Sequence, residues 1–128
     1  MMNVFKFSKA SLAKLQGVHG DLISIAQRAL LLTPIDFSVT EGVRTQERQR
    51  QLYEQHKTPT LNSRHLTGHA IDVLAWHGST CSWYFPDYEL IAVAFKQAAH
   101  GLGLEVEWGG DWKSQDGVHF QLSWKSYP

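Results

Sequence analysis

Hydrophobic and polar residues recur along this chain with two periods, one typical of helices and one typical of strands. From Asp87 onward, apolar residues follow one another at spacings of four, three and four, which predicts a helix with one face on the core. Gly101 and Gly103 supply the end of that helix. Residues 36–40 instead alternate with period two, which predicts a strand.

Start and stop signals divide the rest of the chain into further elements. Ser8 or Ser11 can cap a first helix that ends near Gly17, and Asp21 can cap a second that ends near Leu32. The other expected elements are a helix over residues 46–57 capped by Thr45, a loop over 57–64, a buried strand over 70–75, an aromatic-rich loop over 76–86, and strands over 104–108 and 118–124. The late strands are too closely spaced for helical crossovers, so we predict an α+β fold, a small and mainly antiparallel sheet packed with helices.

Composition indicates one soluble globular unit. Hydrophobic residues make up 43% and charged residues 19% of the 128 residues, close to the averages of globular proteins. No internal repeat, low-complexity tract or linker-like segment divides the sequence. We therefore expect a single domain over residues 1–128, and a monomer.

Charge and cysteine content exclude several classes of function. Twelve basic residues balance twelve acidic ones, so no global positive field favours nucleic acid as a partner. The charge is uneven, however: residues 1–64 contain nine Lys/Arg and five Asp/Glu, whereas residues 65–128 contain three and seven, and this acidic half suits a divalent cation. Cys81 is the only cysteine, which excludes an intrachain disulfide and a cysteine-based zinc site, and we expect it to be a partly buried small residue.

The apolar segments are too short or too interrupted to enter a membrane. Lys6, Lys9 and Lys14 interrupt the N-terminal apolar runs, which therefore lack the continuous apolar region of a secretory signal. The longest apolar stretch, residues 22–32, contains polar residues and is too short to span a bilayer. We expect synthesis in the cytoplasm without membrane insertion, so that action outside the membrane requires another factor for release.

Two clusters of polar residues contain the parts of a catalytic zinc site. One occupies residues 63–72, and the other, residues 116–119, begins 44 residues after Asp72. Catalytic zinc takes three protein ligands from histidine and carboxylate and keeps one position for water, whose pKa falls to about 7. His65, Asp72 and His119 are the candidate ligands.

The residues around these candidates are compatible with a metal site, although spacing alone does not establish it. Gly68 and Ala70 allow a tight turn and close packing behind a metal. Asp116 stands three residues before His119, a position from which its carboxylate could act as general base without being a ligand. Asp-Gly is also a common turn dipeptide, so a purely structural role for Asp116 stays open.

The pattern S-x-H-x-x-G-x-A-x-D, followed by D-x-x-H near the C-terminus, resembles the zinc D-Ala-D-Ala carboxypeptidase family. Within that family the chain is most similar to the phage endolysins that are L-alanyl-D-glutamate endopeptidases. The residues that carry the resemblance are Ser63, His65, Gly68, Ala70, Asp72, Asp116 and His119, with supporting segments at 15–19, 41–45 and 107–112.

The resemblance implies the fold shared by these peptidases and the Hedgehog signalling domain, with one zinc ion on the three candidate ligands. It also implies Asp116 as the catalytic carboxylate, where carboxypeptidase members tend to carry glutamate, and Arg44 as an oxyanion or substrate contact. One departure is visible, because relatives often have proline immediately before the last histidine and this chain has Val118.

Simpler interpretations stand beside several of these assignments. Arg44 could merely pair with Glu41, and Ser63 could bind substrate or only form a local turn. Of Trp108 and Trp112, which flank two glycines, we expect one to line the substrate cleft, and we assign that role to Trp112.

The other histidines are expected to have structural or surface roles. His65 and His69 are four residues apart, as in helical zinc motifs, but Gly68 and the absence of a glutamate after His65 argue against such a helix.

These inferences predict an endolysin-type peptidase that cuts between L-alanine and D-glutamate in the peptidoglycan stem peptide, released through a membrane lesion made by a holin. The first alternative is a D,D- or L,D-carboxypeptidase that removes terminal D-alanine. The second, from another class, is a wall-binding module that keeps the zinc but has lost catalysis.

Overall fold

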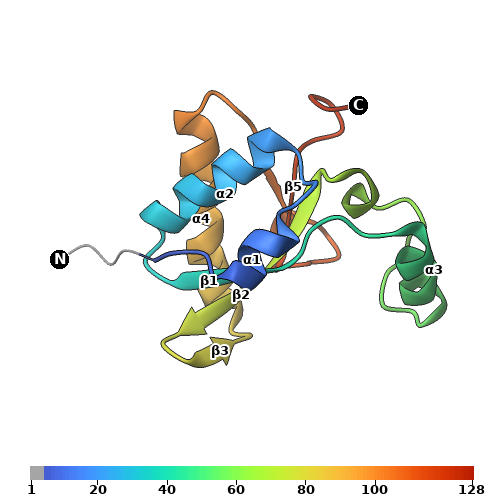
Figure 1. The fold of residues 1–128 in the computed structure, drawn as a ribbon, viewed down its shortest axis with the longest axis horizontal. Helices are drawn as coiled ribbons and strands as arrows, with labels where there is room; N and C mark the ends of the chain where they lie inside the picture. Colours follow the sequence, from blue (N-terminus) through green and yellow to red (C-terminus); the bar gives the residue numbers. More distant parts are fainter. Residues whose placement is uncertain (1–4) are drawn as a thin grey trace.

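In a computed structural model of the chain, residues 5–128 are described, and they form helices around a five-stranded sheet (Figure 1). The helices are α1 (Lys9–Lys14), α2 (Gly20–Leu32), α3 (Gln46–Glu54) and α4 (Phe85–Gly101), with short 3₁₀ turns η1 (Arg64–Thr67) and η2 (Gly109–Asp111). The strands are β1 (Asp36–Glu41), β2 (Ala70–His77), β3 (Thr80–Ser82), β4 (Glu107–Trp108) and β5 (His119–Gln121). The predicted α+β order is therefore confirmed.

The sheet is antiparallel throughout, with β2 at its centre. The strand order is β1-β2-β5-β4, and β3 pairs with the outer part of β2. In the pairing of β2 with β5, Asp72 lies directly opposite His119. Cross-strand partners project from the same face of a sheet, so this register brings two of the candidate ligands together.

One face of the sheet carries the hydrophobic core. Ile71, Val73 and Ala75 alternate along β2 and are fully or almost fully buried, as expected for a strand with one buried face. Phe95 of α4 stacks on Phe120 of β5 with ring centroids 3.9 Å apart, and α2 packs against α4. The residues between these core positions project from the opposite face, which leaves that face available for a polar site.

Helix N-termini agree with the sequence predictions in two cases and differ in two. The side chains of Ser8 and Thr45 accept the capping hydrogen bonds of α1 and α3, as predicted. The prediction of Asp21 as cap of α2 is wrong, because Nδ1 of His19 accepts the hydrogen bond from the Asp21 amide. Helix α4 begins at Phe85, two residues before the predicted start, since a proline in its first turn needs no hydrogen-bond acceptor.

Other boundaries were also predicted inaccurately. Helix α3 ends at Glu54 rather than near residue 57, and His56 beyond it has a left-handed φ of 58°. Part of the expected loop over 76–86 is the edge strand β3, where Cys81 is exposed rather than partly buried. Strands β4 and β5 are shorter than the predicted 104–108 and 118–124.

Helix α3 lies apart from α1, α2 and α4, at the far end of the molecule in Figure 1. The connection between α3 and η1, residues 55–63, returns the chain to the sheet and forms one wall of the cleft described below. Among the described residues, no helix has the length and apolar character needed to cross a membrane.

Candidate active site

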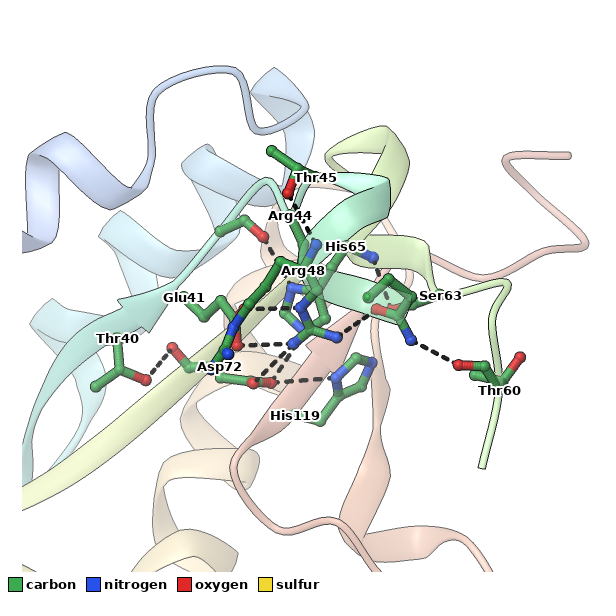
Figure 2. Close-up of polar contacts among 12 residues, drawn as sticks. Thr40, Glu41, Arg44, Thr45, Arg48, Thr60, Ser63, His65, Asp72 and His119 are labelled. Atoms are coloured by element: carbon green, nitrogen blue, oxygen red, sulfur yellow. Dashed lines mark hydrogen bonds and ion pairs between the residues drawn. The ribbon is translucent and has the colours of Figure 1, made fainter. Parts of the chain in front are cut away.

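Three side chains from separate elements converge on the polar face of the sheet (Figure 2). Nε2 of His65, on η1, lies 3.1 Å from Oδ1 of Asp72 on β2, and Nδ1 of His119, on β5, lies 3.2 Å from the same oxygen. Within residues 5–128 these three form the group whose ligand atoms, all within 4.8 Å of one another, could hold a metal ion.

The outer nitrogen of each imidazole has a fixed hydrogen-bond partner. Nδ1 of His65 lies 2.9 Å from the carbonyl oxygen of Gly42, and Nε2 of His119 lies 2.8 Å from Oε1 of Gln121. Both partners are acceptors, so each outer nitrogen carries the proton and the inner nitrogen of a neutral ring presents its lone pair. Two such imidazoles with one carboxylate are the donor set of catalytic zinc, and the residues present therefore fit this metal.

Two glycines allow the backbone segments around His65 to pack closely against one another. Gly68 ends η1 with a φ of 77°, a left-handed conformation that other residues rarely adopt. A Cβ at Gly42 would overlap the carbonyl oxygen of Lys14 at the end of α1. A side chain at Gly42 would therefore move the carbonyl that orients His65.

The carboxylate of Asp72 and the imidazole of His119 stabilise each other's charged forms. Burial opposes ionisation of Asp72, but hydrogen bonds that His119 and His65 donate when their rings are protonated outweigh it and hold the pKa of Asp72 well below its usual value. Burial also opposes protonation of His119, yet the hydrogen bond to Asp72 raises the pKa of His119. The cluster therefore carries a carboxylate suited to a cation.

Asp116 lies beside the candidate ligands on the loop between η2 and β5. Its amide donates to the carbonyl oxygen of Gly109 at 2.9 Å, and its own carbonyl oxygen accepts from the His119 amide at 3.2 Å. A Cβ at Gly109 would overlap Asp116, so only glycine permits this backbone contact. The carboxylate of Asp116 accepts no hydrogen bond from residues 5–128, and the residue lines the cleft. Burial raises the pKa of Asp116, and the negative charge of Asp72 nearby raises it further.

Arg44 lies close to the carboxylate of Asp72, and two other side chains fix its position. Its Nε and Nη2 each donate to a carboxylate oxygen of Glu41 at 2.7 Å, and its Nη1 donates to Oε1 of Gln49 at 2.7 Å (Figure 2). Nη2 also lies 3.8 Å from Oδ2 of Asp72. Arg44 therefore forms the ion pair with Glu41 that the sequence left open as a simpler role. It also lines the cleft, where substrate could reach it. Gln49 was missed because nothing marks one buried glutamine in a polar helix.

The cleft around these groups has a volume of about 630 Å³. Ser63 and Trp112 both line it. Oγ of Ser63 accepts a hydrogen bond from the His65 amide at 3.2 Å, so the residue forms the local turn that the sequence left as an alternative role. The centroid of the Trp112 ring lies 5.2 Å from that of the His119 ring. Trp108 instead is buried.

His69 lies outside this cleft. Its ring is 5.3 Å from that of His19, and its Nδ1 lies 2.7 Å from Oγ1 of Thr67. The sequence analysis also missed Gln121, although its position two residues after His119 on a strand places both on one face and could have identified it.

Comparison with known proteins agrees with this geometry. The family model described as phage L-alanyl-D-glutamate peptidase matches residues 2–126. The L-alanyl-D-glutamate peptidase of Escherichia phage T5 is 32% identical over 128 residues, covering 96% of this chain and 93% of that protein. The enzyme of the same name from Listeria phage A118 is 34% identical over 96 residues, covering 73% of this chain and 32% of that protein.

A solved structure has the same fold. The crystal structure of Serratia marcescens L-Ala D-Glu endopeptidase ChiX matches with a TM-score of 0.92 and 45% identity, covering 98% of this chain and 95% of that chain. The likeness confirms the fold class and the resemblance inferred from the sequence. This chain belongs to the phage L-alanyl-D-glutamate peptidase family.

Proposed function

We propose that this protein is a zinc-dependent peptidase that hydrolyses the bond between L-alanine and D-glutamate in the stem peptide of peptidoglycan. The family and the names of the relatives support the peptidase activity and the bond. The observation that carries the mechanism is a cleft in which two oriented imidazoles and one carboxylate stand beside a second carboxylate, that of Asp116, which has no hydrogen-bond partner among residues 5–128.

His65, Asp72 and His119 hold the metal in this proposal. Zinc bound there supplies Lewis acidity, which polarises a peptide carbonyl and activates water at neutral pH. The Gly42 carbonyl and Gln121 keep both rings oriented through their outer nitrogens.

Asp116 acts as general base and then as general acid. Its carboxylate accepts the proton of the attacking water and passes it to the nitrogen of the departing D-glutamyl residue, which leaves as an amine. Arg44 stabilises the negative charge that develops on the carbonyl oxygen of L-alanine, and its bonds to Glu41 and Gln49 fix the guanidinium before substrate arrives. Ser63 and Trp112 contact the peptide along the cleft wall.

Replacing Asp116 by asparagine tests this assignment. Loss of a general base lowers the rate by about 10² to 10⁴-fold, so the variant should keep one zinc per chain but release few fragments from purified cell walls. Asp111→Asn makes the same chemical change at an exposed residue of the preceding turn and should keep full activity. An active Asp116→Asn enzyme, or one that has lost its zinc, would contradict the role.

The bond is identified by mass spectrometry of digested muropeptides. Fragments with a freed D-glutamyl amine support the endopeptidase, whereas loss of one terminal alanine supports a carboxypeptidase. His119→Ala should lose the metal, and a zinc-loaded, active variant would remove this residue from the ligand set.

In the producing cell we propose a monomeric, single-domain enzyme over residues 1–128. It is made in the cytoplasm and reaches the cell wall through a membrane lesion formed by a holin-like partner.

A further inference from the structure

Arg64 directly precedes the first histidine ligand and is held rigidly in the wall of the cleft. The residue is only 4% exposed. Its Nε and Nη2 donate to the Leu122 carbonyl at 3.3 and 3.1 Å, and Nη2 also donates to the carbonyls of Ser123 at 3.2 Å and Tyr127 at 2.6 Å. The guanidinium lies 4.1 Å from the centroid of the Trp124 ring, a cation–π contact that fixes its plane.

Within the described part of the chain, the positive charge of Arg64 has no direct counter-ion. All of its hydrogen-bond partners are neutral carbonyl groups, and among residues 5–128 no carboxylate lies within ion-pair distance of it. Glu107 attracts the guanidinium of Arg64 electrostatically but is not hydrogen-bonded to it, and the Glu107 carboxylate accepts a hydrogen bond from Gln121. Arg44, the other buried cation of the cleft, is neutralised by Glu41. Burying a cation without a paired anion is unfavourable, so the cleft keeps a charge that an anionic ligand would compensate.

One nitrogen of Arg64 is available to such a ligand. Nη1 carries two N–H groups, and no acceptor in residues 5–128 is bonded to them. No fully buried side-chain nitrogen or oxygen in this part of the chain lacks a partner, so Nη1 must be in contact with solvent. Arg64 and Trp124 both line the cleft that contains the proposed metal ligands, so this cation lies in the wall of the cavity where substrate would bind.

The proposed substrate carries an anionic group on the residue next to the bond that is cut. A D-glutamyl residue has two carboxyl groups, and the peptide chain continues through only one of them. The other is free and negatively charged at neutral pH, on the residue whose amide bond is cut. We propose that Arg64, held in place by Trp124, binds this free carboxylate and determines the preference for an acidic residue after the cleaved bond. The proposal rests on the proposed endopeptidase function.

Two synthetic stem peptides that differ at one group test the proposal. One carries the free carboxylate on the residue after the cleaved bond, and the other carries a neutral carboxamide there. The ratio of kcat/KM for the two peptides measures the preference, and general damage to an enzyme variant cancels in it. The wild-type enzyme should prefer the carboxylate by about 10- to 100-fold, the contribution of a hydrogen bond to a charged group.

Three variants separate Arg64 from the rest of the cleft. Arg64→Gln should lose most of the preference, whatever happens to its total activity. Trp124→Ala changes a half-exposed residue, 48% accessible, so it should fold and reduce the preference by loosening the guanidinium. Lys57→Gln removes an exposed cation that lines the same cleft and should keep the wild-type ratio.

The outcomes distinguish this proposal from the proposed function. A zinc-loaded wild-type enzyme that cuts neither peptide contradicts the function itself. Equal cleavage of both peptides by the wild-type enzyme overturns the role of Arg64 and leaves the endopeptidase intact. An unchanged ratio in Arg64→Gln, or loss of the preference in Lys57→Gln, also overturns it.

Discussion

Gln121 should control how tightly the proposed site binds zinc, although it is not one of the proposed ligands. Nε2 of Gln121 donates to the carboxylate of Glu107 at 3.2 Å, so Oε1 is the atom that faces His119 and accepts its Nε2 proton at 2.8 Å. Gln121→Leu keeps the approximate size of the side chain but removes this acceptor. Because both residues are buried, the N–H of His119 would then have no partner.

The size of the effect follows from the buried hydrogen bond. An orphaned buried donor costs about 1 to 3 kcal/mol, which corresponds to roughly 5- to 150-fold in an equilibrium constant. Loss of an outer hydrogen bond to a metal-bound histidine typically weakens metal affinity by about 10- to 100-fold, in agreement with that range. We therefore expect Gln121→Leu to bind zinc about 10- to 100-fold more weakly than the wild-type protein.

Competition with a chromophoric chelator at fixed pH measures this affinity directly. Glu107→Gln is the matched control, since it changes the other partner of Gln121 but leaves the acceptor that faces His119. Its affinity should stay close to the wild-type value. If Gln121→Leu binds zinc as tightly as the wild type, Gln121 does not orient the imidazole and the reasoning is refuted.

Three further variants probe the core, a carboxylate network and the backbone beside the site. Phe95→Ala should lower the free energy of unfolding by about 3 to 5 kcal/mol in chemical denaturation, because the ring is fully buried; a loss below 1 kcal/mol would contradict its role in the core. Hydrogen bonds, first that from Ser82, lower the pKa of Asp87 below 3.8, so its carboxylate stabilises the fold above that pH and the contribution is lost as pH falls further. Asp87→Asn should therefore have a lower Tm than wild type at pH 7, with a difference that shrinks towards pH 3, and a constant difference would argue against this linkage. Gly109→Ala would displace Asp116 and would also bring the new Cβ to 3.1 Å from Cβ of His119, so kcat on purified cell walls should fall; wild-type kcat would show that the close contact is unnecessary.

Periodicity predicted the parts of the fold that a single buried face specifies. The period-two alternation of residues 36–40 predicted β1, and the apolar segment 70–75 predicted all but the last two residues of β2, in which Asp72 lies on the face opposite the core. Strand β3 was not predicted, because a three-residue edge strand that includes exposed Cys81 buries too little apolar surface to leave a pattern. His19 was not expected as a helix cap because histidine is not among the residues that usually serve there.

The candidate site was predictable in its residue types but not in its arrangement. The sequence supplied His65, Asp72 and His119, yet only the register of β2 and β5 shows that the last two face each other. The supporting groups were harder to predict, since a main-chain carbonyl such as that of Gly42 leaves no sequence signal. Arg64 likewise depends on carbonyls about 58 residues away, which no local pattern connects to it.

The separation of two proposed ligands on neighbouring strands also affects when the protein could take up a cation. His119 lies 47 residues after Asp72, and α4 occupies much of the chain between them. Two ligands on one helix can bind a cation while the remaining chain is unfolded, but these two meet only after the intervening segment has folded and β5 has paired with β2. If β5 paired with β2 one residue out of register, the imidazole of His119 would point towards the hydrophobic core. Cation uptake should therefore come late in folding, and added zinc should slow exchange of the amide hydrogens of both strands together.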